Sequence, residues 1–201
     1  MPGGLRGEHD LEAPMHKLTV TSSVLALFLL APAHAQSVGE KTGVNSVLGI
    51  SPTTQDFVTE AANSDMLEIA AAKIAQDKGN ADEKKFAAQM TTDHTKTTND
   101  IKAMVESGDV KAEIPATLDS SHQSKLDKLR DAKADNFSSD YDSMQVSAHK
   151  DAVSLFERYS KSGDNPKLKD WAGKTLPTLR HHLELAQSLD KNRSSTMGSA
   201  K

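Results

Sequence analysis

Four ionisable side chains fall on the apolar faces of four different segments that have helical periodicity. They are Glu68, His94, His149 and His182, one from each segment. On a helical wheel at about 100° per residue, each lies within or at the edge of its apolar stripe, whereas His181 points away from it. Because a buried ionisable group needs a partner, we expect the four side chains to meet if the segments pack together.

The chemistry that this set of side chains offers is metal binding. One carboxylate and three imidazoles from facing helices suit zinc, iron, manganese or copper, so the four residues are candidate ligands of a single transition-metal ion. Three further polar side chains lie close enough to orient these ligands or to add to them, namely Asp93, Asp142 and Gln145.

Two other hypotheses fit the same residues. In the first, Glu68 accepts hydrogen bonds from one or more of the histidines, and the polar layer only fixes how the helices pair. A histidine on an apolar face is more often structural than a ligand, which favours this hypothesis. Such a protein would act through its charged surface, as a stress or interaction protein of the cell envelope.

In the second, the layer serves a metal-dependent redox or hydrolytic enzyme. Such an enzyme needs an open coordination position and a pocket that reaches solvent. The sequence has no cysteine and no phosphate-binding glycine loop, and no Ser-His-Asp spacing stands out. It therefore favours a non-catalytic protein over an enzyme.

The elements that must position these side chains are helices. Periodicity and helix-stop residues predict four long helices and one short one, at about residues 54–78, 80–107, 119–134, 138–161 and 166–189. Asn80 with Glu83 three residues later forms a capping-box pattern, and Pro177 predicts a bend in the last helix. Two tightly connected pairs of long helices predict an all-α, antiparallel four-helix bundle over residues 53–190, with the short helix in the crossover.

The N-terminus has the features of a secretory signal peptide. The apolar run from Val20 to Ala31 is followed by Ala33-His34-Ala35 and is too short for a permanent membrane anchor. We expect translation to start at Met15, cleavage after Ala35, a flexible lead-in at residues 36–52 and a disordered tail at residues 191–201. These features predict a periplasmic or secreted protein without integral membrane insertion.

The composition limits the size and the partners of the protein. The sequence has 201 residues, of which 36% are hydrophobic and 26% are charged, and its formal net charge is −4. This length suits one domain, and the lack of a basic excess argues against a nucleic-acid partner. Without cysteines, the fold must depend on its core rather than on disulfides.

Three sequence blocks, "MTTDH", "AHKDAVSLFE" and "LPTLRHHLELA", resemble the exported bacterial family catalogued as domain of unknown function 4142. The resemblance covers about Phe57 to Leu189. It implies a ferritin-like fold, and it implies that the family's histidines fall at His94, His149 and His182. Members of this family are often labelled outer-membrane proteins. It leaves the activity open.

Ferritin-like di-iron sites use several glutamates and paired Glu-x-x-His motifs. This sequence has Gln145-x-x-x-His149 and Asp93-His94 instead. We therefore do not expect a standard ferroxidase centre.

Overall fold

The long helices begin and end where short polar signals interrupt the apolar periodicity. The computed structural model describes residues 3, 37, 39 and 44–199, and within these residues it contains helices and no strand. The helices are α2 (Val44–Leu48), α3 (Thr54–Lys78), α4 (Ala81–Glu106), α5 (Ser120–Asp131), α6 (Ala134–Ser162) and α7 (Pro166–Ser199). The predicted all-α class is confirmed. The predicted start at Met15 and the signal peptide with its cleavage after Ala35 lie outside the described residues.

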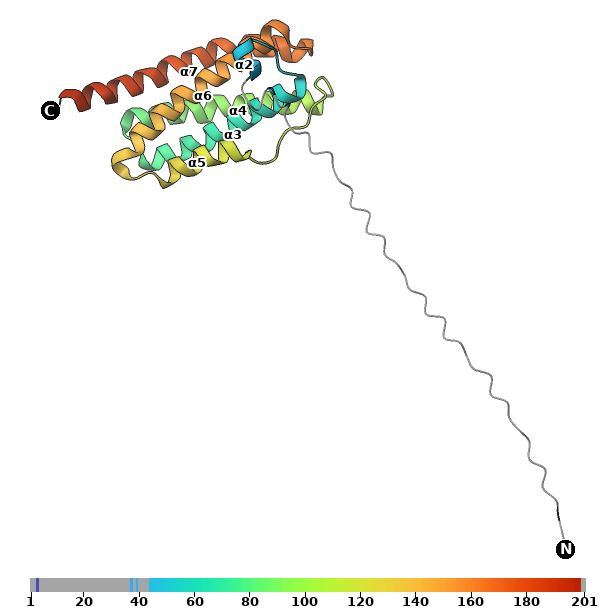
Figure 1. Ribbon diagram of the computed structural model, residues 1–201, viewed down its shortest axis with the longest axis horizontal. Coiled ribbons are helices and arrows are strands. Elements are labelled where there is room, and N and C mark those ends of the chain that lie inside the picture. The colour runs from blue at the N-terminus through green and yellow to red at the C-terminus, as the bar shows by residue number, and fades with distance from the viewer. Residues whose placement is uncertain (1–2, 4–36, 38, 40–43, 200–201) are drawn as a thin grey trace. The chain divides into compact units, whose positions relative to one another are not determined.

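The four long helices α3, α4, α6 and α7 lie side by side, and α5 lies in the connection between α4 and α6 (Figure 1). The short turns between α3 and α4 and between α6 and α7 make the members of each pair run in opposite directions. Contacts of α3 with α6 and of α4 with α7 join the two pairs. Side chains on four helices can therefore meet in one interior.

The turn between α3 and α4 is fixed by the predicted capping box. The Asn80 side chain accepts hydrogen bonds from the backbone N–H groups of Asp82 and Glu83, and Glu83 Oε2 accepts one from the Asn80 N–H at 2.8 Å. These bonds satisfy N–H groups that the first turn of a helix leaves without partners. The turn sets the heights of Glu68 on α3 and His94 on α4 relative to each other.

Three predicted helix boundaries are wrong, and one of them is the end of α5, which lies at Asp131 instead of near residue 134. The helix α6 begins at Ala134, earlier than residue 138, so that only residues 132–133 separate it from α5. The helix α7 continues to Ser199, although we expected it to end near Leu189 and the tail to be disordered. Arg193 ties the added turns to the bundle through ion pairs with Asp142 on α6 and with Asp190 one turn earlier.

Part of the lead-in predicted at residues 36–52 forms the helix α2, which contacts α6. Ser46 Oγ lies 3.0 Å from Ser154 Oγ, and Arg158 donates a hydrogen bond to the carbonyl of Ile50 at 2.7 Å. In the part of the chain that the structure describes, no helix is long and apolar enough to cross a membrane.

The core consists of two hydrophobic clusters with polar side chains between them. We call the first the aromatic cluster, because Phe57, Phe156, Tyr159 and Trp171 lie in or against it. The second cluster lies toward the α3–α4 turn and contains small residues of α3 together with Phe86 of α4. On each long helix, the sequence passes from one cluster to the other through buried polar residues, so these residues form a layer across the bundle.

Candidate metal centre

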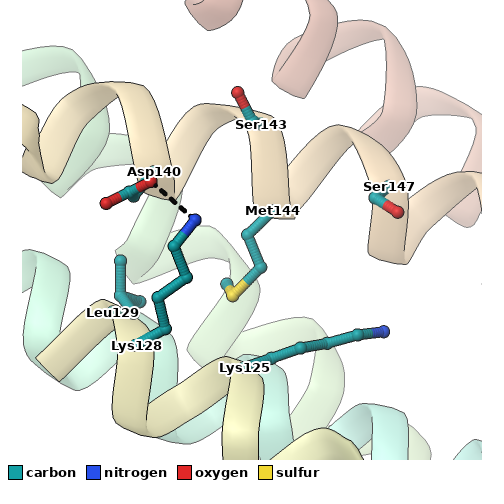
Figure 2. Close-up of a pocket in the computed structure, with 7 residues that line it drawn as sticks. All are labelled: Lys125, Lys128, Leu129, Asp140, Ser143, Met144 and Ser147. Carbon is teal, nitrogen blue, oxygen red and sulfur yellow. Dashed lines mark ion pairs between the residues drawn. The ribbon is translucent and has the colours of Figure 1, made fainter.

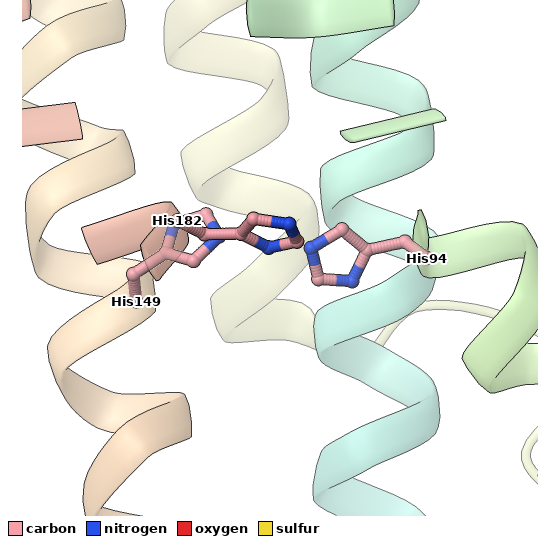
Figure 3. Close-up of side chains that lie close together, drawn as sticks. All are labelled: His94, His149 and His182. Carbon is pink, nitrogen blue, oxygen red and sulfur yellow. The ribbon is translucent and has the colours of Figure 1, made fainter. Parts of the chain in front are cut away.

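Three histidines from three helices meet in this layer. His94 on α4, His149 on α6 and His182 on α7 are only 1–2% exposed, and their ring centroids are 5.5–5.7 Å apart (Figure 3). The adjacent His181 is exposed. The predicted orientations are confirmed: His182 faces the core and His181 faces solvent. We call the three buried residues the histidine triad.

His94 is held by a carboxylate of α3. Its Nδ1 lies 2.8 Å from Asp65 Oδ1, and the hydroxyl of Thr97 donates to the same carboxylate at 2.8 Å, with Thr98 donating at 3.0 Å. Because an ionised carboxylate only accepts hydrogen bonds, His94 Nδ1 carries the proton in this contact. The other ring nitrogen, Nε2, has no hydrogen-bond partner in the described structure and carries a lone pair when the ring is neutral.

The other two histidines are held in the same manner. His149 Nδ1 donates to the backbone carbonyl of Gln145 at 2.9 Å, and His182 Nε2 lies 2.8 Å from Asp93 Oδ2. A carbonyl oxygen and a carboxylate are acceptors, so the lone pairs remain on His149 Nε2 and His182 Nδ1. Each histidine thus has one nitrogen that is anchored and one that is free to bind.

Ring nitrogens of the three histidines lie close together. One ligand nitrogen from each histidine lies within 4.8 Å of the other two. Among the described residues, His94 Nε2, His149 Nε2 and His182 Nδ1 have no hydrogen-bond partner, and all three are buried. When all three rings are neutral, three acceptors lie close together without a donor and repel one another, and burial in a medium of low polarity makes this repulsion larger. A cation at their centre would remove it.

Glu68 supplies a negative charge beside the triad. Its side chain is buried, and neither carboxylate oxygen has a hydrogen-bond partner among the described residues. The charge acts on both His94 and His149, in each case favouring the protonated ring. Glu68 therefore lies near the triad but does not accept hydrogen bonds from it, which is contrary to the hypothesis of a purely structural network built on Glu68.

Burial lowers the proton affinity of two members of the triad. Burial lowers the pKa of His149, and it lowers the pKa of His182 to about 4 although Asp93 opposes the change. For His94, burial is outweighed by the hydrogen bond to Asp65 and by nearby carboxylates, and the pKa is raised above its ordinary value. His149 and His182 are therefore neutral at neutral pH, and neutral imidazole is the form that binds metals.

Of the three residues predicted to support the ligands, two contact a histidine of the triad and one does not. Asp93 contacts His182 directly, and Gln145 contributes its backbone carbonyl to His149. Asp142 contacts Arg193 instead of a histidine. Asp65 was not among the predicted residues, although it precedes Glu68 by three residues, a spacing that places both on one face of α3.

A surface pocket of about 240 Å³ lies elsewhere, between α5 and α6 (Figure 2). Leu129 and Met144 line it together with Lys128 and Asp140, whose side chains form an ion pair at 2.9 Å. No member of the histidine triad lines this pocket. Its chemistry is therefore separate from that of the buried layer.

Comparison with known proteins identifies a family. The model of a family described as Domain of unknown function (DUF4142) matches residues 39–189. No curated protein and no solved structure matches the chain. The match includes all three residues of the histidine triad.

Proposed function

The chain belongs to this family of unknown function, and we propose that its histidine triad binds a single transition-metal ion, with Glu68 as the nearest further ligand. The observation that carries the proposal is the orientation of the rings. Each histidine uses one nitrogen to contact an acceptor, its other nitrogen has no partner in the described structure, and each ring offers a nitrogen within 4.8 Å of the other two.

This arrangement is typical of metal-binding histidines. A ligating histidine usually donates its second N–H to a carboxylate or a backbone carbonyl, which fixes the tautomer and makes the ligand nitrogen more basic. Asp65 and Asp93 are such carboxylates, and Gln145 provides such a carbonyl. A structural polar network would instead use the inner nitrogens for hydrogen bonds within the layer.

The donor set favours zinc or copper among the divalent metals. Three imidazole nitrogens suit both ions, and zinc commonly completes four ligands with a carboxylate oxygen. The triad is buried, which supports retention or sequestration of the ion more than turnover of a substrate. We therefore propose metal binding without catalysis as the function of the site.

We also propose the finer fold and location that the sequence indicates. The two tightly connected helix pairs and the crossover containing α5 support a ferritin-like four-helix bundle. The apolar run from Val20 to Ala31 and the site Ala33-His34-Ala35 support export to the periplasm or beyond the cell.

The proposal is tested by metal content and melting curves of the protein purified without a histidine tag. We expect about one equivalent of zinc or copper and a higher melting temperature with the metal than after chelation, because a ligand of the folded state stabilises it. His149→Ala and His182→Ala should lose the metal and the shift. His181→Ala is the matched control, since it removes the adjacent, exposed imidazole and should retain both.

The anchoring carboxylate gives a second test. Asp65→Asn should keep the metal but weaken its affinity by roughly 10–100-fold, since the amide holds the ring without the negative charge. The proposal is wrong if the wild-type protein binds none of zinc, copper, iron and manganese stoichiometrically. It is also wrong if His181→Ala loses as much metal as His182→Ala.

A further inference from the structure

A second group of buried polar side chains lies between the histidine triad and the α3–α4 turn. Glu83 is in the first turn of α4, and Tyr141, Asp142 and Gln145 share one face of α6, and all four are at most 1% exposed. Among the described residues, each has a buried side-chain atom without a hydrogen-bond partner: Glu83 Oε1, Tyr141 Oη, Asp142 Oδ1 and both amide atoms of Gln145. We call this group the carboxylate layer.

The two carboxylates of this layer are anchored on one side and free on the other. Glu83 Oε2 accepts the backbone N–H of Asn80 at 2.8 Å, and Asp142 Oδ2 lies 3.2 Å from Nε of Arg193. The second oxygen of each carboxylate is buried and without a partner in the described structure. This repeats the arrangement of the histidine triad, in which one atom is fixed and the other is left to bind.

The members of the layer act on one another electrostatically. Burial and the charge of Glu83 raise the pKa of Asp142 to about 7, against the opposing charge of Arg193. Burial and the charges of Glu68, Glu83 and Asp142 raise the pKa of the Tyr141 hydroxyl. The carboxylates and the hydroxyl therefore share one region, where negative charge exceeds the single positive charge of Arg193.

We propose that the carboxylate layer is a second cation site, in which Glu83, Asp142 and Gln145 bind a hard divalent cation beside the Tyr141 hydroxyl. The free atoms that can act as ligands are oxygens, and carboxylate, amide and hydroxyl oxygens suit magnesium, manganese and calcium. The triad offers nitrogens to a softer ion. The layer is more than an acidic cluster, because it also contains the buried amide of Gln145. Burying an amide with both polar atoms unpaired costs free energy of folding unless something binds it.

The test uses Mn²⁺ as the probe and the EPR signal of free Mn²⁺ as the measure. The histidine triad is removed first by His149→Ala, so that binding at the second site is observed whether or not the triad binds metal. We expect this full-length variant to bind about one equivalent of Mn²⁺. Adding Glu83→Gln or Asp142→Asn should weaken the affinity by at least roughly tenfold, because each substitution replaces a charged ligand with an amide.

The choice of substitutions protects the fold. Glutamine at position 83 can still accept the Asn80 N–H, so the capping box is kept. Tyr141→Phe keeps the ring and removes only the hydroxyl, and it should also weaken Mn²⁺ binding. It provides the test if the carboxylate variants do not fold. Asp140→Asn is the matched control, because Asp140 is an α6 carboxylate that faces the pocket between α5 and α6 and pairs with Lys128, and it should leave the affinity unchanged. Absence of saturable Mn²⁺ binding would overturn the proposal, as would equal losses in Asp140→Asn and Asp142→Asn.

Discussion

Phe57 and Glu68 lie on the same face of α3, three helical turns apart, and are equally buried at 0% and 1% exposure. Their surroundings differ. Phe57 stacks on Tyr159 with ring centroids 4.2 Å apart and meets Phe156 edge-on at 4.9 Å. Glu68 has no hydrogen-bond partner for either oxygen in the described structure. The same helix therefore joins a well-packed region to one in which buried polar atoms lack hydrogen-bond partners in the described structure.

The comparison extends to the polar atoms of the two regions. In the aromatic cluster, the Tyr159 hydroxyl is hydrogen-bonded with the Thr54 side chain at 2.6 Å and with Asp164 at 3.1 Å. In the polar layers, atoms that are just as deeply buried are unpaired. Unpaired buried polar groups oppose folding, so a chain that keeps several of them close together gains something other than stability. We take the first region as the source of stability and the second as the source of function.

The largest effect should come from the aromatic cluster. Phe57→Ala removes a buried ring that packs against the rings of Phe156, Tyr159 and Trp171, and we expect it to lower the free energy of unfolding by about 3–5 kcal/mol. Chemical denaturation of the metal-free protein measures this change. The folded fraction should still bind zinc with the wild-type stoichiometry, and loss of zinc binding in the folded variant would contradict the division between the two regions.

The pH dependence of stability should come from the polar layer. Because the pKa of His182 falls from 6.5 to about 4 on folding, the unfolded chain binds more protons between these values. Stability from this residue is complete above about pH 6.5 and is lost as the pH falls toward 4, by about 2 kcal/mol between pH 8 and pH 5. The raised pKa of His94 acts in the opposite sense.

Unfolding of the metal-free protein at several pH values isolates the contribution of His182. His182→Gln keeps an N–H for Asp93 and should flatten the loss of stability at acid pH. His181→Gln should leave the profile unchanged, since its side chain is exposed. A profile that His182→Gln does not alter would contradict the assignment of a neutral, buried imidazole.

Helix bounds could be predicted from the sequence where neighbouring residues set them, and not where a distant contact sets them. The bounds of α3 and the capping box at Asn80 could be predicted because the residues that set them are within one helical turn. The end of α7 could not, because a polar tail is held as a helix by the ion pair of Arg193 with Asp142, which are 51 residues apart. Propensity alone does not report such contacts.

The inward-facing histidines could be predicted from helical periodicity. Periodicity gives the direction in which a side chain points, but not its level along the bundle or its partners on other helices. Asp142 lies on the same face of α6 as His149, but seven residues separate them, or about 10 Å along the axis. This distance places Asp142 in the carboxylate layer. Asp65 was missed because its role depends on His94 and Thr97 of another helix, and no spacing within α3 indicates them.

The smallest effect on the free energy of unfolding should come from Glu68→Gln, measured without and with zinc. Glu68→Gln replaces a buried, unpaired carboxylate with an uncharged amide of the same shape. At about pH 8, where His149 and His182 are neutral, we expect the metal-free variant to unfold with a free energy about 1 kcal/mol higher than the wild type. With saturating zinc the order should reverse, because the variant lacks the negative charge beside the ion. If Glu68→Gln destabilises the metal-free protein instead, Glu68 has a structural partner and the layer contributes to folding as the aromatic cluster does.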